Sequence, residues 1–299
     1  GYSALALTDE CSVAGIVRAH VAAKACGLKL IVGSEVALED GTRLVLLATD
    51  RRSYGALCSL ITTGRRRARK GGYALSRSDV EPLAESGALA LLVPGDRLRP
   101  DSALWLAELF AARAWIAAEL HCGANDRARL ALLGELSAAS RLPLVAAGDV
   151  HMHIRSRRRL QDTLTAIRLG RPVAQCGHAL HPNAERCLRL RMRLAQLYPP
   201  ALLTETLAVA ERCSFLLDEL RYEYPEELVP EGQTPASWLR RLTLGGLDWR
   251  FPDGVPERVR ELVEHELALI AELRYEAFFL TVHDVVRFAR ERDILCQGR

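Results

Sequence analysis

Short runs of apolar residues, bounded by polar or turn-forming residues, recur along the first half of the chain. Six of them predict strands, at residues 4–7, 28–32, 44–48, 89–93, 115–120 and 142–147. Because these runs are apolar throughout and do not alternate, they are typical of strands buried on both faces. Stretches with helical spacing lie between them, as around residues 13–20 and 128–139. The alternation predicts an α/β fold with a mainly parallel sheet, open or closed into a barrel.

After about Pro172 the pattern changes to helices separated by connectors that contain proline or glycine. Helices are predicted over residues 199–213, 234–244, 256–275 and 281–292, with the Gly245-Gly246 pair ending the second of them. A linker-like stretch around residues 224–232 separates the last three helices from the rest. We therefore expect one domain over residues 1–224 and a second over residues 225–299.

Composition excludes several classes of protein. The chain has 299 residues, is 49% hydrophobic and 26% charged, and carries a net charge of +3, so a large core is expected and bulk charge does not indicate a nucleic-acid binder. No apolar run is long enough to cross a bilayer, and we expect a cytoplasmic protein. The eight cysteines form no CxxC pair, which argues for free thiols over a zinc site or disulfides.

Polar residues with metal-binding side chains follow several predicted strands at their carboxyl ends. In an α/β barrel these ends meet on one face, where active sites are built. Carboxylates and imidazoles gathered there could hold Zn or Mn and activate water for attack on a phosphoester. The candidates are Glu10, Glu35, Asp149 and His151, with His121 or Cys122 as a further ligand whose alignment is not fixed.

Simpler interpretations stand beside this one. Asp9 or Ser12 could cap the helix that begins near Val13, as acidic and hydroxyl residues after strands commonly do. Cys122 is more often a small buried side chain than a ligand. His20, which shares a helix face with Ile16, is expected to pack against the core.

Two clusters of arginine could contact nucleic-acid phosphates. One is the run Arg65, Arg66 and Arg67, which is followed by Arg69 and Lys70, and the other surrounds residues 155–159. A basic run is usually a solvated helix face, so neither cluster alone identifies a DNA-binding protein. No Walker-type glycine loop is present in the sequence.

Several segments, in order, resemble the alpha subunits of bacterial C-family DNA polymerases, especially their error-prone, damage-induced branch. These subunits begin with a PHP domain, a distorted (β/α)7 barrel. Residues 1–9 are similar to the second PHP motif, and residues 28–35 are similar to its glutamate motif. Residues 147–153 with 160–170 are similar to the DVH motif and the stretch after it. Residues 272–290 are similar to the helix that enters the polymerase palm.

The same resemblance covers the last residues. Cys296-Gln297-Gly298-Arg299 is similar to the opening of the family's phosphate-contacting QGRGS motif, which implies nucleotide binding by Gln297, Gly298 and Arg299. The palm aspartates that hold two Mg²⁺ ions for synthesis on a primer-template with deoxynucleotides would lie after Arg299. We therefore expect both ends to be cuts through a longer protein and no catalytic palm residue within this chain.

Departures from the family pattern bear on the metal site. The first PHP motif, an HxH pair, is absent, Glu10 stands in place of the histidine of the second, and Arg43 stands where a histidine often precedes the third strand. A cation among metal ligands disfavours the metal. The resemblance therefore implies a PHP barrel lacking its N-terminal part, with a degenerate site.

The function that the resemblance implies is error-prone DNA synthesis across damaged templates, in company with other mutagenesis or replisome proteins and without a membrane. Two alternatives stay open at this point. One is an active PHP phosphoesterase, including a 3′ exonuclease, which needs a nearly complete ligand set. The other is a non-enzymatic scaffold module of a mutagenesis complex.

Overall fold

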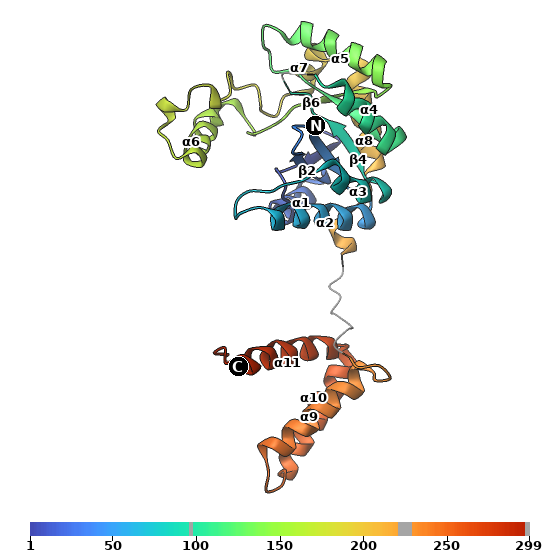
Figure 1. Ribbon diagram of the computed structural model, residues 1–299, viewed down its shortest axis with the longest axis vertical. Coiled ribbons are helices and arrows are strands. Elements are labelled where there is room, and N and C mark those ends of the chain that lie inside the picture. Colours follow the sequence, from blue (N-terminus) through green and yellow to red (C-terminus); the bar gives the residue numbers. More distant parts are fainter. Residues whose placement is uncertain (96–97, 221–228, 297–299) are drawn as a thin grey trace. The chain divides into compact units, whose positions relative to one another are not determined.

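The computed structural model describes residues 1–95, 98–220 and 229–296, and the chain forms two compact units. The first unit comprises Gly1–Leu220 and the second Arg221–Arg299 (Figure 1). The boundary predicted between residues 224 and 225 lies outside the described residues. No helix in the described ranges is both long and apolar enough to span a membrane.

Six strands form one sheet in the first unit, and their order in the sheet follows the chain. They are β1 (Ala4–Leu7), β2 (Lys29–Ala37), β3 (Arg43–Leu47), β4 (Leu89–Leu92), β5 (Ala114–Glu119) and β6 (Leu144–Ala147). The pairs β1–β2, β4–β5 and β5–β6 are parallel, whereas β3 is antiparallel to both of its neighbours. The sheet is thus mainly parallel, as predicted, with one reversed strand.

The reversal of β3 follows from the short connection before it. Only five residues, 38–42, separate β2 from β3, which is enough for a hairpin but not for the crossover that a parallel pair requires. Asp40 accepts a hydrogen bond from the Thr42 amide at 2.8 Å, and Gly41 has a φ of 83° that favours glycine. The turn therefore fixes β3 against β2.

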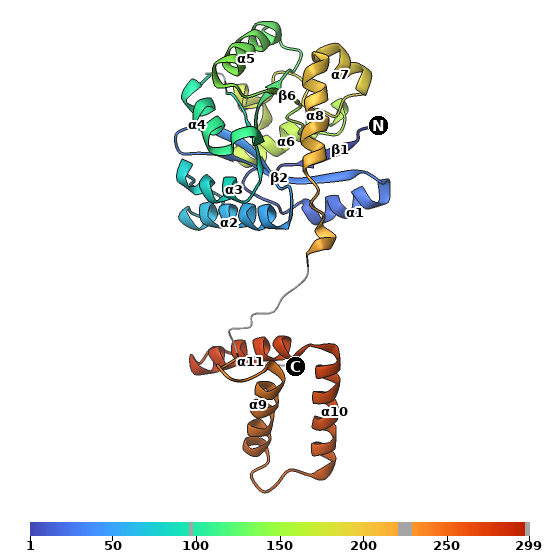
Figure 2. The same cartoon turned by 90° about the vertical axis from the view of Figure 1, so that its right-hand side faces the viewer.

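Eight helices of the described first unit accompany the sheet, and α8 packs against β6 (Figures 1 and 2). They are α1 (Ile16–Cys26), α2 (Arg51–Arg67), α3 (Glu81–Glu85), α4 (Pro100–Phe110), α5 (Asp126–Ser140), α6 (Arg158–Leu169), α7 (Arg191–Leu197) and α8 (Pro200–Arg212). The strand, helix, strand succession confirms the predicted α/β class, and α1 begins after Gly15 with no side-chain cap from Asp9 or Ser12.

Apolar side chains are buried on both faces of the sheet, which explains why the strand sequences do not alternate. In β5, Ile116 lies in the larger core together with Leu44 and Leu133, while Trp115 lies in a second cluster with Val145 and Val209. All six side chains are at most 6% exposed. The sheet of the described residues has six strands, with β1 and β6 at its edges, where the resemblance implied a (β/α)7 barrel.

The described part of the second unit is helical, as predicted, with α9 (Pro235–Arg250), α10 (Glu257–Leu273) and α11 (Glu276–Glu291) around a core of Leu239, Ile270 and Leu280. Two predicted bounds were wrong. Helix α9 continues through Gly245-Gly246, because packing of the helix outweighs the intrinsic cost of glycine, about 1 kcal/mol each. Helix α11 begins five residues before the predicted residue 281, since left-handed Arg274 ends α10 and leaves only Tyr275 between them.

Candidate functional site

The carboxyl ends of five strands meet at one edge of the sheet, together with the first residue of reversed β3. This arrangement follows from the strand directions, since β1, β2, β4, β5 and β6 all run the same way. The edge therefore gathers the segments after β1, β5 and β6 with the end of β2, and the reversal of β3 adds Arg43 to them. We refer to it as the carboxyl edge.

On one side of the carboxyl edge, Glu10 and Glu35 are partners in a parallel β-bridge. Glu35 lies inside β2, two residues before its end, and not after the strand as predicted. Its carboxylate accepts a hydrogen bond from Arg43 Nε at 3.0 Å and a second one from Arg43 Nη2. The carboxylate of Glu10 instead accepts from the Tyr73 hydroxyl at 2.8 Å. We call Glu10, Glu35 and Arg43 the strand half of the site.

On the other side, the Asp149 carboxylate is paired with two groups. Its Oδ1 lies 2.9 Å from Nε2 of His151, and its Oδ2 forms an ion pair with Arg186. The Asp149 side chain is only 14% exposed and that of Arg186 21%, so solvent screens the pair weakly. Asp149 has a φ of 41°, a left-handed conformation that aspartate tolerates better than most residues.

Arg186 reaches Asp149 because its segment is held against the chain after β6. His151 N donates to Arg186 O at 3.0 Å, and Leu188 N donates to Met152 O at 3.2 Å. The Tyr2 hydroxyl, from the start of the chain, donates to Arg189 O at 2.7 Å. We call residues 182–189 the strap, and Asp149, His151 and Arg186 the strap half of the site.

The other ligand candidates, His121 and Cys122, follow β5 and contact neighbours of the strap half. Nε2 of His121 lies 3.2 Å from the carbonyl oxygen of Gly148. Cys122 is exposed, contrary to the expectation of a small buried side chain, and its backbone has a left-handed φ of 56°. Its thiol donates to Glu185 at 3.4 Å and accepts from Arg193 at 3.4 Å.

Burial and the two arginines set the protonation of the site. Burial lowers the pKa of His121 to about 4, with a further contribution from Arg186, and burial also lowers the pKa of His151. Burial raises the pKa of Glu119, the last residue of β5, although Arg186 and Arg43 oppose that shift. At neutral pH both imidazoles are therefore uncharged, while arginines supply the positive charge at the edge.

The arrangement does not fit a bound metal ion. Within the described residues, no three His, Cys, Asp or Glu side chains converge on a point that could hold one. The four predicted ligands divide into two pairs, and the carboxylates of Glu35 and Asp149 each bind a guanidinium. A fixed positive charge beside a carboxylate occupies its lone pairs and repels a cation. Arginine thus neutralises the carboxyl edge.

Sequence analysis identified Arg43 but missed Arg186 and Tyr73. Both missed residues lie in loops far along the chain from their partners, Arg186 on the strap and Tyr73 after α2. The Tyr73 hydroxyl also accepts a hydrogen bond from Ala37 N at 2.9 Å, at the end of β2. No periodic pattern or short motif marks a loop residue that contacts a distant strand, so the sequence carried no signal for either.

The basic run at the end of α2 lies beside the strand half. Arg65 is occupied internally, since its guanidinium donates to Glu10 O and Cys11 O, each at 3.1 Å. Arg67 forms an ion pair with Asp79 at 2.6 Å. Arg66 and its neighbours Arg69 and Lys70 are exposed. The predicted nucleotide-binding residues, Gln297, Gly298 and Arg299, lie outside the described residues.

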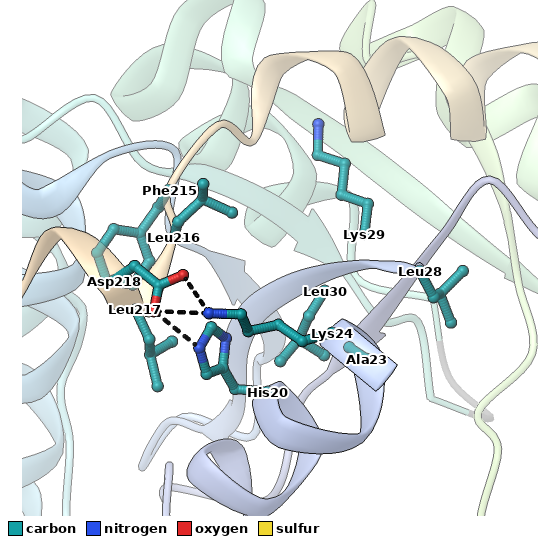
Figure 3. A pocket seen from close by; sticks show the side chains of 10 residues that line it. All are labelled: His20, Ala23, Lys24, Leu28, Lys29, Leu30, Phe215, Leu216, Leu217 and Asp218. Atoms are coloured by element: carbon teal, nitrogen blue, oxygen red, sulfur yellow. Dashed lines mark hydrogen bonds and ion pairs between the residues drawn. The ribbon is translucent and has the colours of Figure 1, made fainter. Parts of the chain in front are cut away.

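A hollow lies between α1 and the segment after α8, away from the carboxyl edge (Figure 3). His20 and Lys24 of α1 both point at Asp218, with Nε2 of His20 at 3.3 Å and Nζ of Lys24 at 3.0 Å from its carboxylate. His20 is therefore not a simple packing residue as predicted. These contacts join α1 to the segment after α8.

Comparison with known proteins shows what this chain resembles. Residues 1–99 match the PHP domain, and residues 237–299 match the bacterial DNA polymerase III alpha NTPase domain. The whole chain is 60% identical to the error-prone DNA polymerase of Dechloromonas aromatica, 59% to that of Methylococcus capsulatus and 57% to that of Pseudomonas aeruginosa PAO1. It spans 30%, 29% and 29% of the length of these relatives.

One solved structure, described as a candidate metal-dependent phosphoesterase from Bifidobacterium adolescentis, matches half of this chain and 77% of its own. Its identity is 14% and its TM-score 0.37, a likeness too low to bear on function. The relatives at 57–60% identity and the two domain matches in chain order agree with one another. Over its whole length the chain is homologous to a region of error-prone DNA polymerases, with a PHP match followed by a match to the DNA polymerase III alpha domain.

Proposed function

We propose that the protein containing this chain is a DNA-directed DNA polymerase that extends a primer with deoxynucleotides across damaged templates. The observation that carries the proposal is the continuous similarity, 60% identical over the entire chain, to a polymerase described as error-prone. A polymerase of this kind would use Mg²⁺, act on DNA in the cytoplasm and work with other mutagenesis or replisome proteins. Gln297, Gly298 and Arg299 would contact the triphosphate of the incoming nucleotide.

Primer extension tests this proposal. The full-length polymerase should extend a primer past an abasic site in the presence of Mg²⁺, and Arg299→Ala should raise the KM for the nucleotide about tenfold by removing a charged contact of roughly 1.4 kcal/mol. Arg292→Ala, an exposed arginine seven residues earlier, is the matched control. A full-length protein that extends neither damaged nor undamaged template would refute the proposal.

For the carboxyl edge we propose a scaffold role without metal catalysis. The support is the pairing of Glu35 with Arg43 and of Asp149 with Arg186, which leaves no free carboxylate pair for Zn or Mn. An active phosphoesterase or 3′ exonuclease would need such a pair to activate water. Stoichiometric Zn or Mn in the purified full-length protein, lost in Asp149→Ala together with nuclease activity, would contradict the scaffold role.

We further propose that the end of α2 contacts DNA phosphates through Arg66, with Arg69 and Lys70. Arg65 and Arg67, which the sequence also suggested, are held by backbone carbonyls and by Asp79. Arg66→Ala with Arg69→Ala should weaken DNA binding and reduce the slope of log affinity against log salt by about 2, since each phosphate contact contributes about 0.9. Arg127→Ala, an exposed arginine on α5, serves as the control and should leave the slope unchanged.

A further inference from the structure

Helix α6 exposes most of its large aliphatic side chains and buries small ones. Thr165 and Ala166 are buried, Leu169 is half-buried, and Asp162 binds Arg158 at 2.7 Å. The outer side carries three large aliphatic side chains at helical spacing i, i+4 and i+7. Leu160 is 50% exposed, Leu164 53% and Ile167 71%. A helix that packs only on its own unit has the opposite arrangement.

The surroundings of α6 explain how this face stays open. The main contacts of α6 are with its flanking turns at Arg155–Arg157 and Val173–Gln175, and not with the sheet. Figure 1 shows α6 standing away from the strands of its own unit. Single exposed apolar residues are common, but three on one continuous helix stripe mark an interaction surface. We call Leu160, Leu164 and Ile167 the α6 stripe.

Charge at the ends of α6 restricts what can cover the stripe. Arg157 and Arg159 at its start and Arg168 and Arg171 at its end are all exposed. An antiparallel pairing of two copies of α6 would place the arginines at one end of a helix against those at the other end of its partner. The repulsion disfavours self-association and favours a surface with an apolar floor and acidic residues at its rim.

The length of the relatives indicates where such a surface lies. Because this chain spans 30% of the Dechloromonas polymerase, the remaining 70% of that protein lies outside the matched region. A surface joined covalently to α6 has an effective concentration in the millimolar range, well above that of a diffusing protein. A surface within the same polypeptide therefore meets the stripe before any separate partner does.

We propose that the α6 stripe is an intramolecular docking face, which packs into an acidic-rimmed apolar groove on a part of the polymerase outside residues 1–299. The proposal rests on one part of the proposed function, namely that residues 1–299 are a region of a longer polymerase. Docking would hold the first unit against the synthesising part of the enzyme. The carboxyl edge, from which α6 extends through residues 149–157, would then be positioned by the same contact.

Photo-crosslinking in the purified full-length polymerase tests the docking directly. With p-benzoylphenylalanine in place of Ile167, irradiation should link position 167 to a peptide from outside residues 1–299, in a band of monomer mass, with and without primer-template DNA. The same residue in place of Leu132, a lone 50% exposed side chain on α5, is the control and should give no such link. Primer extension by both proteins is measured separately, so loss of activity and loss of docking are distinguishable.

Thermal unfolding gives a second readout. Ile167→Arg should lower the unfolding temperature of the full-length polymerase by about 3 °C or more, because a covered apolar side chain becomes a buried charge. Leu132→Arg should change it by less than about 1 °C. The proposal is overturned by a link only to a second copy, to DNA or to residues 1–299, or by no link above the control. An unchanged unfolding temperature for Ile167→Arg overturns it as well.

Discussion

In both the strand half and the strap half of the carboxyl edge an arginine neutralises a carboxylate, but the two arginines come from different kinds of segment. In the strand half, Glu35 and Arg43 are diagonal neighbours across a hairpin, since Glu35 is in register with Val45 and Arg43 with Ala37. In the strap half, Asp149 meets an arginine from a loop 37 residues further along the chain, at residue 186. Charge neutralisation at this edge therefore does not depend on one local motif.

The two halves also differ in burial, and this difference predicts unequal mutational effects. The Arg43 side chain is 42% exposed and can turn to water if its partner is removed, whereas that of Arg186 is 21% exposed. A charge that stays buried without a partner is costly, while a charge that regains solvent is not. The strap half should thus be the more sensitive of the two.

The largest effect is expected for Asp149→Ala. Removing this carboxylate leaves the Arg186 guanidinium largely buried without its partner and should lower the free energy of unfolding by about 2 kcal/mol. Urea denaturation of the full-length protein, followed by a probe in the first unit, measures the change. Adding Arg186→Met should restore most of the lost free energy of unfolding. If the double variant is no more stable than Asp149→Ala, the unpaired arginine is not the cause of the destabilisation.

A smaller effect is expected for Glu35→Gln in the strand half. The amide keeps the shape and one acceptor oxygen but loses the charge, and Arg43 can extend into solvent, so the loss should be about 0.5–1 kcal/mol. The same urea denaturation measures it, with Glu39→Gln on the neighbouring turn as a control. If Glu35→Gln costs as much as Asp149→Ala, burial does not distinguish the halves.

Mild acid should also destabilise the protein, without any substitution, through His121 beside the strap half. Burial and the charges of Arg186 and Arg189 lower the pKa of His121 to about 4 from its usual 6.5, with Asp126 opposing them. The unfolded chain therefore binds this proton first, and stability should fall as the pH drops from 6.5 toward 4. Thermal unfolding at pH 7 and pH 5 measures the loss of stability, and His121→Gln should make this loss smaller. A loss of the same size in His121→Gln would show that another group causes it.

Much of the fold was predictable because burial on both faces of a sheet imposes apolar strands. All six strands were predicted, and five of them agree within two residues at each end, whereas β2 runs five residues past its predicted end. The approach of Glu10 to Glu35 follows from parallel β1 and β2. The end of α9 and the start of α11 could not be predicted from the positions of glycines or from the spacing of apolar residues. In both places the packing of the helix outweighs the intrinsic helix propensity of single residues. Arg186 was not predictable either, because its position depends on the path of the strap.

The hairpin that carries Glu35 and Arg43 has a consequence for the order of folding. Bringing together Glu35 and Arg43, eight positions apart, costs less chain entropy than bringing together Asp149 and Arg186, 37 positions apart, by about 1.4 kcal/mol. The β2–β3 hairpin can form its ion pair early, while the strap must wait until β6 and the start of the chain are in place. In the native protein the strap should accordingly be the first part of this edge to open. The amides of His151 and Leu188, which join the strap to the segment after β6, should be the first to exchange with solvent.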